Sequence, residues 1–383
     1  MPEQFGLLNN FWWSNQRPNW GPVSNCYGDA EHAGGKMVPG LPPPVCMPLS
    51  VFQNPKKFEY PVCMSRKGLT RGIDGDWFTT DPIMTQDFKG LISDIMKSLA
   101  ASIFSGNGMV GLSLPIRIFQ PMGTLEMIAE TQSGYPFWIN KANATADPVE
   151  RMKFVICGMV AGLKLPLSFR KPFHPHLGET YAQTFADGTH LSMEQVSFDP
   201  PVTSYLGVKK GQWRWYGRYL HGVNLSTNSF SLDYVGPVTV EFSDKTTLMA
   251  FFPNFTSAGV TYGKRSLYYE NKACFIYKQH GLKGYIHFGK VQKKPPSLKY
   301  PEKLVKDRKD VFRGKIWKVD PKKFKDIRFG KEDVRENYKN VQERFNEKDI
   351  GLEISTFCGS FTETVEFDGV EYWNNETMDP PCH

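Results

Sequence analysis

The stretch MEQVSFDPPV at residues 193–202 decides the fold class, because it opens a long series of strand-like segments. These segments are rich in β-branched and aromatic residues and are separated by turn-forming residues. They span residues 189–198, 213–219, 229–242, 247–255, 266–278 and 283–291. Several are apolar on both faces, as expected when a sheet curls around an apolar interior. The sequence therefore predicts a mainly β fold built from an antiparallel meander.

Two helices are predicted before the strands. The first has apolar residues at three- and four-residue spacing, which is the pattern of an amphipathic helix; they are Leu91, Ile92, Ile95 and Leu99, and Leu112 and Leu114 follow them in an extended segment. The second helix begins after Asp147, which can cap it, with Pro148 in the first position and Glu150 completing a capping box. The apolar residues of the first helix either line a ligand cavity or pack in an ordinary core.

Two motifs carry a resemblance to a known family. KPFHPHLGETY at residues 171–181 precedes EQVSFDPP at 194–201, and DPVERMKFV lies upstream at 147–155. Their order and spacing are similar to those of the oxysterol-binding protein-related family, whose ligand domain carries K-P-x-N-P-x-L-G-E-T-Y and E-Q-V-S-H-H-P-P. The likeness runs from about residue 85 to the C-terminus and includes FDGVEYWN at 367–374.

The resemblance implies an α+β fold with an incomplete antiparallel β-barrel around a lipid tunnel, an N-terminal amphipathic lid and a C-terminal helical region. Family members extract one lipid from a membrane, and many exchange a sterol or phosphatidylserine for phosphatidylinositol 4-phosphate. We expect the following organisation: an aromatic, Pro- and Gly-rich arm at 1–84 and a ligand domain at 85–383, with the lid at about 85–112, the barrel at about 171–291, and a basic segment and C-terminal region at 292–383.

The residues that hold a phosphoinositide headgroup in the family are altered here. Lys171 is retained, but His174 stands in the asparagine position, and Phe198 and Asp199 replace the two histidines. Phenylalanine donates no hydrogen bond, and an aspartate repels phosphate. We therefore expect Lys171, His174 and Arg344 at the tunnel mouth, without obligatory exchange of phosphatidylinositol 4-phosphate.

A C-terminal helix is expected at residues 330–345, where the family places Lys, Glu and Arg at four-residue spacing on one face. Anchored on Arg344, the three positions read Glu336, Asn340 and Arg344. The charge order of the family is thus not preserved. Two alternatives stay open: a headgroup site rebuilt with His174, His176 and His190, and a weaker hypothesis, a metal site made of the same three histidines.

Residues 292–325 carry thirteen Lys or Arg against four acidic residues, while the whole chain has a net charge of +7. A basic segment of this kind suits either an anionic membrane surface or simple exposure to solvent. No nucleic-acid-binding module accompanies the charge, so we expect no nucleic-acid partner.

No nucleophile motif, phosphate-binding loop or paired metal-ligand motif is present, so the sequence favours a carrier over an enzyme and implies no cofactor. The start of the chain lacks a basic lead, and the longest apolar run, 154–163, is too short to span a bilayer. We expect a cytoplasmic, monomeric protein, peripheral on membranes, that carries one lipid, a sterol first. The alternatives are a phospholipid carrier with a rebuilt headgroup site and a lipid-responsive interaction protein that transfers nothing.

Overall fold

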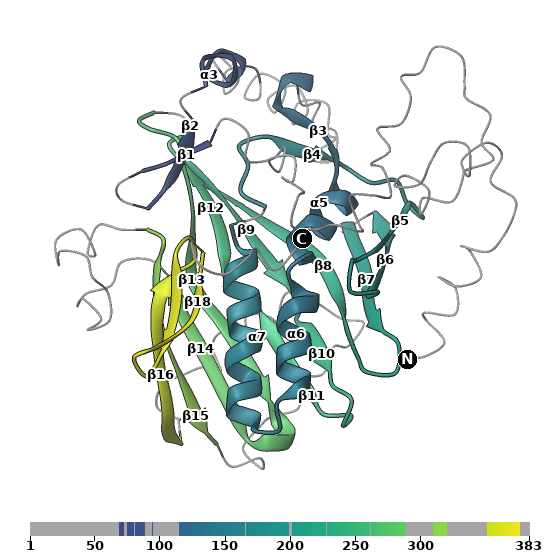
Figure 1. Ribbon diagram of the computed structural model, residues 1–383. Helices are drawn as coiled ribbons and strands as arrows, with labels where there is room; N and C mark the ends of the chain where they lie inside the picture. The colour runs from purple at the N-terminus through teal and green to yellow at the C-terminus, as the bar shows by residue number, and fades with distance from the viewer. Residues whose placement is uncertain are drawn as a thin grey trace, which may run out of the picture.

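The computed structural model describes residues 69–72, 75–79, 81–88, 94, 115–164, 166–198, 201–226, 228–260, 262–288, 309–319 and 351–375. In these ranges the chain forms a large curled antiparallel sheet, a small two-stranded sheet and a layer of helices (Figure 1). None of the helices in these ranges is long and apolar enough to cross a membrane.

The large sheet has 16 strands, and most spatial neighbours are consecutive in the chain. Its main path runs β18-β17-β16-β15-β14-β13-β11-β10-β8-β7-β6-β5, and β1, β2, β9 and β12 branch from it. The bounds are β1 Leu69–Arg71, β2 Trp77–Thr79, β5 Thr180–Thr184, β6 His190–Phe198, β7 Pro201–Lys209, β8 Trp213–Leu225, β9 Ser229–Val235, β10 Val238–Glu241, β11 Thr247–Phe251, β12 Asn254–Ala258, β13 Ser266–Tyr277, β14 Leu282–Phe288, β15 Val311–Lys318, β16 Leu352–Ser360, β17 Thr364–Phe367 and β18 Val370–Asn374. Among the described residues the end strands β5 and β18 do not pair, so the predicted incomplete barrel is confirmed.

Helices cover one face of this sheet, which we call the inner face (Figure 1). They are α5 Thr124–Gln132, α6 Tyr135–Ala144 and α7 Pro148–Gly162; a short helix, α3 Pro82–Phe88, and two 3-10 turns, η4 Ile116–Ile118 and η5 Lys278–His280, lie elsewhere. The helices bury their apolar sides against large aromatic residues of the sheet, including Trp215, Tyr269 and Phe275. This core fixes the helices over the middle of the sheet.

The predicted start of α7 is confirmed in part. The Asp147 carboxylate accepts a hydrogen bond from the backbone N–H of Val149 at 3.0 Å, and Pro148 is the first helical residue. Glu150 does not complete a capping box. Its carboxylate instead accepts hydrogen bonds from Lys153 Nζ at 2.8 Å and Tyr372 Oη at 2.6 Å. A lysine one turn further along α7 and a hydroxyl from β18 therefore replace the backbone donor of a capping box.

A buried arginine joins α7 to the β10–β11 hairpin. The Arg151 side chain is 7% exposed and forms an ion pair of 2.5 Å with Asp244. It also donates to Tyr277 Oη at 2.8 Å and to the backbone oxygens of Ala142 and Thr145, and its guanidinium lies 4.7 Å from the Phe242 ring centroid. The buried guanidinium is therefore held by its ion pair with Asp244, by hydrogen bonds and by stacking on Phe242.

The same helix also contacts the other end of the sheet. Lys153 Nζ lies 3.5 Å from the Asp368 carboxylate in the β17–β18 turn, while Glu150 accepts from Tyr372 of β18. Helix α7 thus holds the last hairpin against the inner face by polar contacts at its first turns.

The sheet departs from the expected barrel range of 171–291 at both ends. The strand at Lys171, β4 Lys171–Phe173, pairs in parallel with β3 Phe119–Gly123 and not with the large sheet. Beyond residue 291, strands β15 to β18 extend the sheet to Asn374. Strand β2, inside the expected arm, pairs with β13 through Trp77 and Leu267. The helix expected at 330–345 lies outside the described residues, in the connection between β15 and β16.

Candidate functional site

The motif KPFHPHLGETY begins on the short β3–β4 pair, above α5 (Figure 1). Phe119 and Phe173 stack with ring centroids 5.0 Å apart, and Thr124 Oγ1 donates to the carbonyl of Phe173 at 2.7 Å. Strand β4 is only three residues long, because prolines interrupt the pairing of the extended backbone. It ends before His174 and His176, which lie in a loop. Pairing with Phe119 of β3 fixes the backbone at Lys171.

Lys171 and His174 are in direct contact. Lys171 Nζ lies 2.5 Å from His174 Nε2 and 5.6 Å from the Phe119 ring centroid. Burial lowers the pKa of Lys171, and burial together with the Lys171 charge lowers the pKa of His174. The neutral imidazole can accept a hydrogen bond from the lysine. The pair therefore presents one partly desolvated positive charge.

The fingerprint strand β6 ends beside this loop. The N–H of Gly178 donates to the carbonyl of Gln195 at 2.8 Å, and the N–H of Gln195 donates to the carbonyl of Glu179 at 2.9 Å. The two sequence motifs are therefore joined by backbone hydrogen bonds. Phe198 is the last residue of β6 and is 61% exposed, and its ring offers a ligand no hydrogen-bond donor.

Exposed apolar side chains surround this end of β6 and β4. Phe173 is 42% exposed, Leu177 65%, Val196 45% and Phe198 61%. We call these four residues the rim. Large apolar side chains gathered at one place on a surface mark a contact with something apolar.

The described residues form two small pockets on the inner face, each with about 20 Å³ of free space, enough for about one water molecule. The upper pocket lies between α5, the end of α7 and the sheet, and is lined by Met127, Ile128, Thr131, Leu163, Pro166, Tyr219, Tyr234, Phe252 and Tyr269. Since α5 directly follows β3, this pocket adjoins the segment that carries Lys171.

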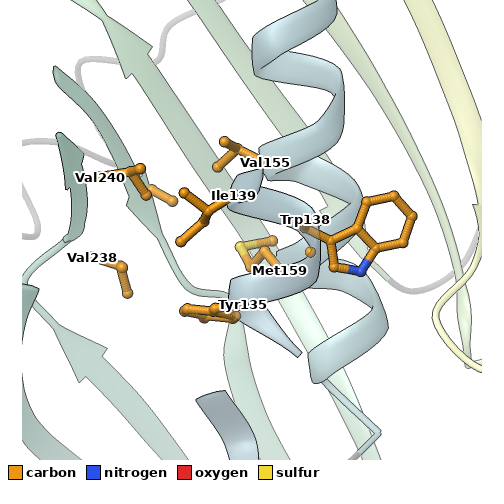
Figure 2. A pocket seen from close by; sticks show the side chains of 9 residues that line it. Tyr135, Trp138, Ile139, Val155, Met159, Val238 and Val240 are labelled. Carbon is orange, nitrogen blue, oxygen red and sulfur yellow. The ribbon is translucent and has the colours of Figure 1, made fainter. Parts of the chain in front are cut away.

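The lower pocket is apolar and lies between the paired helices and the middle of the sheet. Figure 2 shows Tyr135, Ile139 and Met159 of α6 and α7 near Val238 and Val240 of β10. The linings of both pockets belong to the main core. We take the upper pocket as the candidate ligand site because it adjoins the segment that carries Lys171.

The upper pocket has a hydroxyl-bearing wall. Burial raises the pKa of Tyr219 to about 12 and raises those of Tyr234 and Tyr269 as well, so all three phenols stay neutral. Tyr269 Oη donates to the carbonyl of Leu163 at 2.9 Å. The pocket thus combines aromatic surface with neutral polar groups and has no charged side chain in its lining.

The structure describes only some of the predicted site residues. It places Lys171 beside His174, and backbone hydrogen bonds join the loop that follows them to β6, the strand that ends at Phe198. Asp199, Arg344 and the predicted lid and tunnel residues lie outside the described residues; the latter are Leu91, Ile92, Ile95, Leu99, Leu112 and Leu114.

His190 does not join the other two histidines. It opens β6, at the opposite end of the strand from Phe198, and its Nδ1 lies 3.1 Å from Thr184 Oγ1. Both alternatives that combine His174, His176 and His190 in one site therefore lose His190. In the described part of the chain, no three His, Cys, Asp or Glu residues lie close enough to hold a metal ion.

The tyrosines of the upper pocket were not selected from the sequence. Tyr219 and Tyr269 alternate with outward residues in strands that are apolar on both faces, so periodicity alone does not separate pocket from core. The one signal in the sequence is that these tyrosines occur in strands apolar on both faces, where a buried phenol hydroxyl needs a hydrogen-bond partner.

The chain is similar to known proteins of one family. The family model described as "Oxysterol-binding protein" matches residues 98–352. Oxysterol-binding protein 9 of Dictyostelium discoideum is 28% identical over 309 residues, covering 80% of this chain and 67% of the relative. Human oxysterol-binding protein-related protein 6 is 37% identical over 103 residues, which cover 26% of this chain and 11% of that protein. The chain thus spans about a tenth of the human relative.

Two solved structures share the fold. The Osh3 ORD of Saccharomyces cerevisiae, solved in complex with PI(4)P, is 19% identical with a TM-score of 0.52, covering 72% of this chain and 65% of that one. The Osh1 ORD domain, solved in complex with cholesterol, is 17% identical with a TM-score of 0.50, covering 78% and 67%. At these identities the likeness shows a shared fold and nothing more specific.

Proposed function

Because the chain belongs to the oxysterol-binding protein family, a family of lipid-binding and lipid-transfer proteins, we propose that it carries a single lipid, a sterol, between membranes. The lipid lies between α5, the end of α7 and the inner face of the sheet, and it enters past β4 and the rim. Because the free space there holds about one water molecule, α5 must move away from the sheet to admit the lipid. The solved relatives bound to cholesterol and ergosterol support a sterol as a ligand class for this fold.

The observation that carries the choice of a neutral lipid is the exposed Phe198. In the position where the family fingerprint supplies a phosphate-binding histidine, this chain has an exposed apolar ring. The upper pocket likewise contains no charged side chain. A sterol needs apolar surface and one neutral hydrogen-bonding group, and burial of its apolar area contributes about 25 cal/mol per Å².

Transfer between liposomes tests the function. Donor vesicles with a fluorescent sterol are mixed with acceptor vesicles, and phosphatidylserine and phosphatidylinositol 4-phosphate are assayed in parallel. We expect sterol transfer to exceed transfer of either phospholipid. Extraction of none of the three lipids would favour an interaction protein without transfer, and strong extraction of phosphatidylinositol 4-phosphate would contradict our account of Phe198 and Asp199.

Filling the upper pocket should block the ligand. We expect Ile128→Phe to lower sterol extraction about tenfold, because the larger side chain occupies the candidate site. Ala250→Val in the lower pocket is the matched control, since it adds volume to the core without touching the upper pocket. Sterol extraction in vesicle flotation, with the unfolding midpoint measured for both variants, checks the prediction. Equal losses in both variants would assign the effect to stability and remove the upper pocket as the site.

A second candidate function is carriage of an anionic phospholipid, and the partly buried charge of Lys171 beside His174 favours it. We expect Lys171→Met to lower phosphatidylserine extraction about tenfold while sterol extraction stays unchanged, because a hydrogen bond to a charged group contributes about 1.5 to 3 kcal/mol. Lys245→Met removes an 81% exposed lysine at a distant turn and is the control. An equal loss of both lipids in Lys171→Met would mean that the lysine supports the fold and not a headgroup.

Contact with an anionic membrane surface is also proposed for the basic segment at 292–325. Its described part forms β15, where several lysines already have partners in the sheet. Lys315 pairs with Glu353 at 2.7 Å, Lys318 Nζ donates to the carbonyl of His280, and Lys309 lies 3.6 Å from the Asp76 carboxylate. We therefore propose that the lysines at 293–308 and 322–325 make the membrane contact.

A further inference from the structure

Helix α5 is joined to the large sheet by a buried hydrogen bond at its last residue. The indole N–H of Trp215 in β8 donates to Gln132 Oε1 at 2.7 Å, and both side chains are fully buried. The Trp215 ring lies across β7, because its cross-strand partner is Gly207, where a Cβ would come within 2.2 Å of the ring. The tryptophan therefore reaches the helix from a fixed position on the sheet.

The Gln132 amide is only half satisfied in this arrangement. Its oxygen accepts from Trp215, which fixes the orientation of the amide. Its Nε2 is buried and makes no hydrogen bond to any residue that the structure describes. Burial raises the pKa of the neighbouring Tyr219 to about 12 and the amide lowers it in part, but the two groups do not reach hydrogen-bonding geometry. A buried donor without an acceptor destabilises the position of α5 against the sheet, and it would be hydrated if the helix moved outward.

The first turn of α5 is attached to the small sheet instead. Thr124 Oγ1 donates to the carbonyl of Phe173 in β4 at 2.7 Å. The helix is nine residues long, Gly123 precedes it, and Gly134 follows soon after its end. Small residues at the ends of an element often absorb the backbone rotation of a hinged segment. Helix α5 can therefore turn about its first residue once its last residue is released.

The upper pocket lies beneath the end of α5 that carries Gln132. Ile128 and Thr131 of α5 line one wall, and Tyr219 and Tyr269 of the sheet line another. The free space holds about one water molecule, whereas a ligand the size of a sterol occupies a pocket of about 300 Å³ or more. Because Thr131 directly precedes Gln132, the pocket widens when this end of the helix leaves the sheet.

The neighbouring helix α6 carries a matching hydrogen bond but has further support. Trp213, two residues before Trp215 in β8, donates its indole N–H to Asn140 Oδ1 at 2.9 Å. Asn140 Nδ2 also donates to the Asp187 carboxylate at 2.9 Å. Helix α6 lies side by side with α7, whereas α5 lies beyond the end of this pair (Figure 1). The chain thus offers two indole–amide bonds on one strand, each to a different helix.

We propose that α5 is the gate of the candidate lipid site and that the hydrogen bond between Trp215 and Gln132 is its latch. The inference rests on the proposed lipid-carrier function and names the contact that controls entry. In the closed form the latch holds the last turn of α5 against β8. In the open form water hydrates both ends of the Gln132 amide, while the Trp215 ring stays on the sheet over Gly207. The latch is weak, because the unpaired Nε2 opposes its one hydrogen bond.

Loosening the latch should speed the uptake of lipid. We expect Gln132→Met, which keeps the side-chain length but removes the hydrogen bond, to raise the initial rate of sterol extraction from vesicles about fivefold. Asn140→Leu is the matched control, since it removes the corresponding bond from α6 and should not raise the rate. A purely structural role would lower the unfolding midpoint and slow extraction in both variants. Gln132→Asn, whose amide is one methylene shorter, should act in the same direction if Gln132→Met folds poorly.

Hydrogen exchange tests the gate without any lipid. The backbone amides of α5 should exchange about fivefold faster in Gln132→Met while those of α6 keep their native rate, because exchange follows the population of the open form. The proposal is overturned if α5 exchanges no faster in the variant, if α5 exchanges only together with α6 and α7, or if faster exchange brings no faster extraction in a protein that does extract sterol. Faster exchange of α5 with no sterol extraction even by the native protein would support the gate and contradict the sterol-carrier function.

Discussion

Replacing Phe198 and Asp199 together with histidine is expected to raise the affinity for phosphatidylinositol 4-phosphate by about two to three orders of magnitude. A like charge at about 4 Å costs on the order of 4 kcal/mol near a protein surface, which is about a thousandfold in affinity, and screening lowers this at exposed positions. Two imidazoles would add hydrogen-bond donors for a phosphate. Phe198 is exposed, so the change should leave the stability within about 0.5 kcal/mol.

The measurement is extraction of phosphatidylinositol 4-phosphate from vesicles at a fixed salt concentration. Asp199→Asn alone removes the repulsion without adding a donor and should give an intermediate gain, while Phe198→His alone should give little. Adding Lys171→Met to the double variant should abolish most of the gain, because the proposed headgroup site then loses the positive charge of the lysine. The idea fails if the double variant gains nothing, or if the gain is the same without Lys171.

Arg151→Leu is expected to lower the free energy of unfolding by about 3 kcal/mol or more. The change removes the donor of the partly buried Thr145 carbonyl and one of two partners each of the Tyr277 hydroxyl, which keeps Thr246, and of the Ala142 carbonyl, which keeps the Thr145 N–H. A hydrogen bond from a charged group contributes about 1.5 to 3 kcal/mol. Asp244 is partly exposed, so water compensates for part of its loss. The unfolding midpoint should fall by about 6 °C or more.

Arg214→Leu is the matched control. Arg214 also pairs with a carboxylate, Glu241, at 2.7 Å, but its side chain is 50% exposed. Removal of a surface pair should cost less than about 1 kcal/mol. Denaturant unfolding of both variants gives the comparison, and equal losses would contradict the importance of burial at Arg151.

The Arg151 contribution should also depend on pH. Partial burial would raise the pKa of Asp244, but hydrogen bonds from Thr246 and Arg151 outweigh it and lower the pKa to about 2. A carboxyl with a depressed pKa stabilises the fold above its unfolded pKa, which is near 3.8, and this contribution is lost as the pH falls towards 2. The difference between the native protein and Arg151→Leu should therefore narrow over that range.

The sequence was informative where one local pattern determines the structure. The strand series and the order of the two motifs predicted the open barrel, and the Asp147 cap predicted the start of α7. Glu150 was wrongly assigned to a capping box, because its carboxylate pairs with Lys153 one turn further along α7 and with Tyr372, which comes near only in the folded chain. His190 was placed near His174 by sequence distance, yet the length of β6 separates them.

The candidate site was less predictable than the fold. Lys171 and Phe198 follow from the motifs, but their neighbours come from strand pairing that spans the whole chain. The upper pocket combines α5 with β8, β9 and β13, and nothing local marks Tyr219 or Tyr269 as pocket residues. In the same way, the position of residues 330–345 between two strands of the sheet depends on strands that follow them.

The open edge of the barrel affects the range of ligands that it can accommodate. Among the described residues, β5 and β18 do not form a hydrogen-bonded seam, and α7 holds the last hairpin through Lys153, Glu150 and Tyr372. The position of the last hairpin relative to the helices is therefore set by side-chain contacts of about 1 kcal/mol each and not by a continuous backbone ladder. An open barrel of this kind can widen for a broader lipid by exchanging a few contacts, whereas a closed barrel has a circumference fixed by its strand number and stagger.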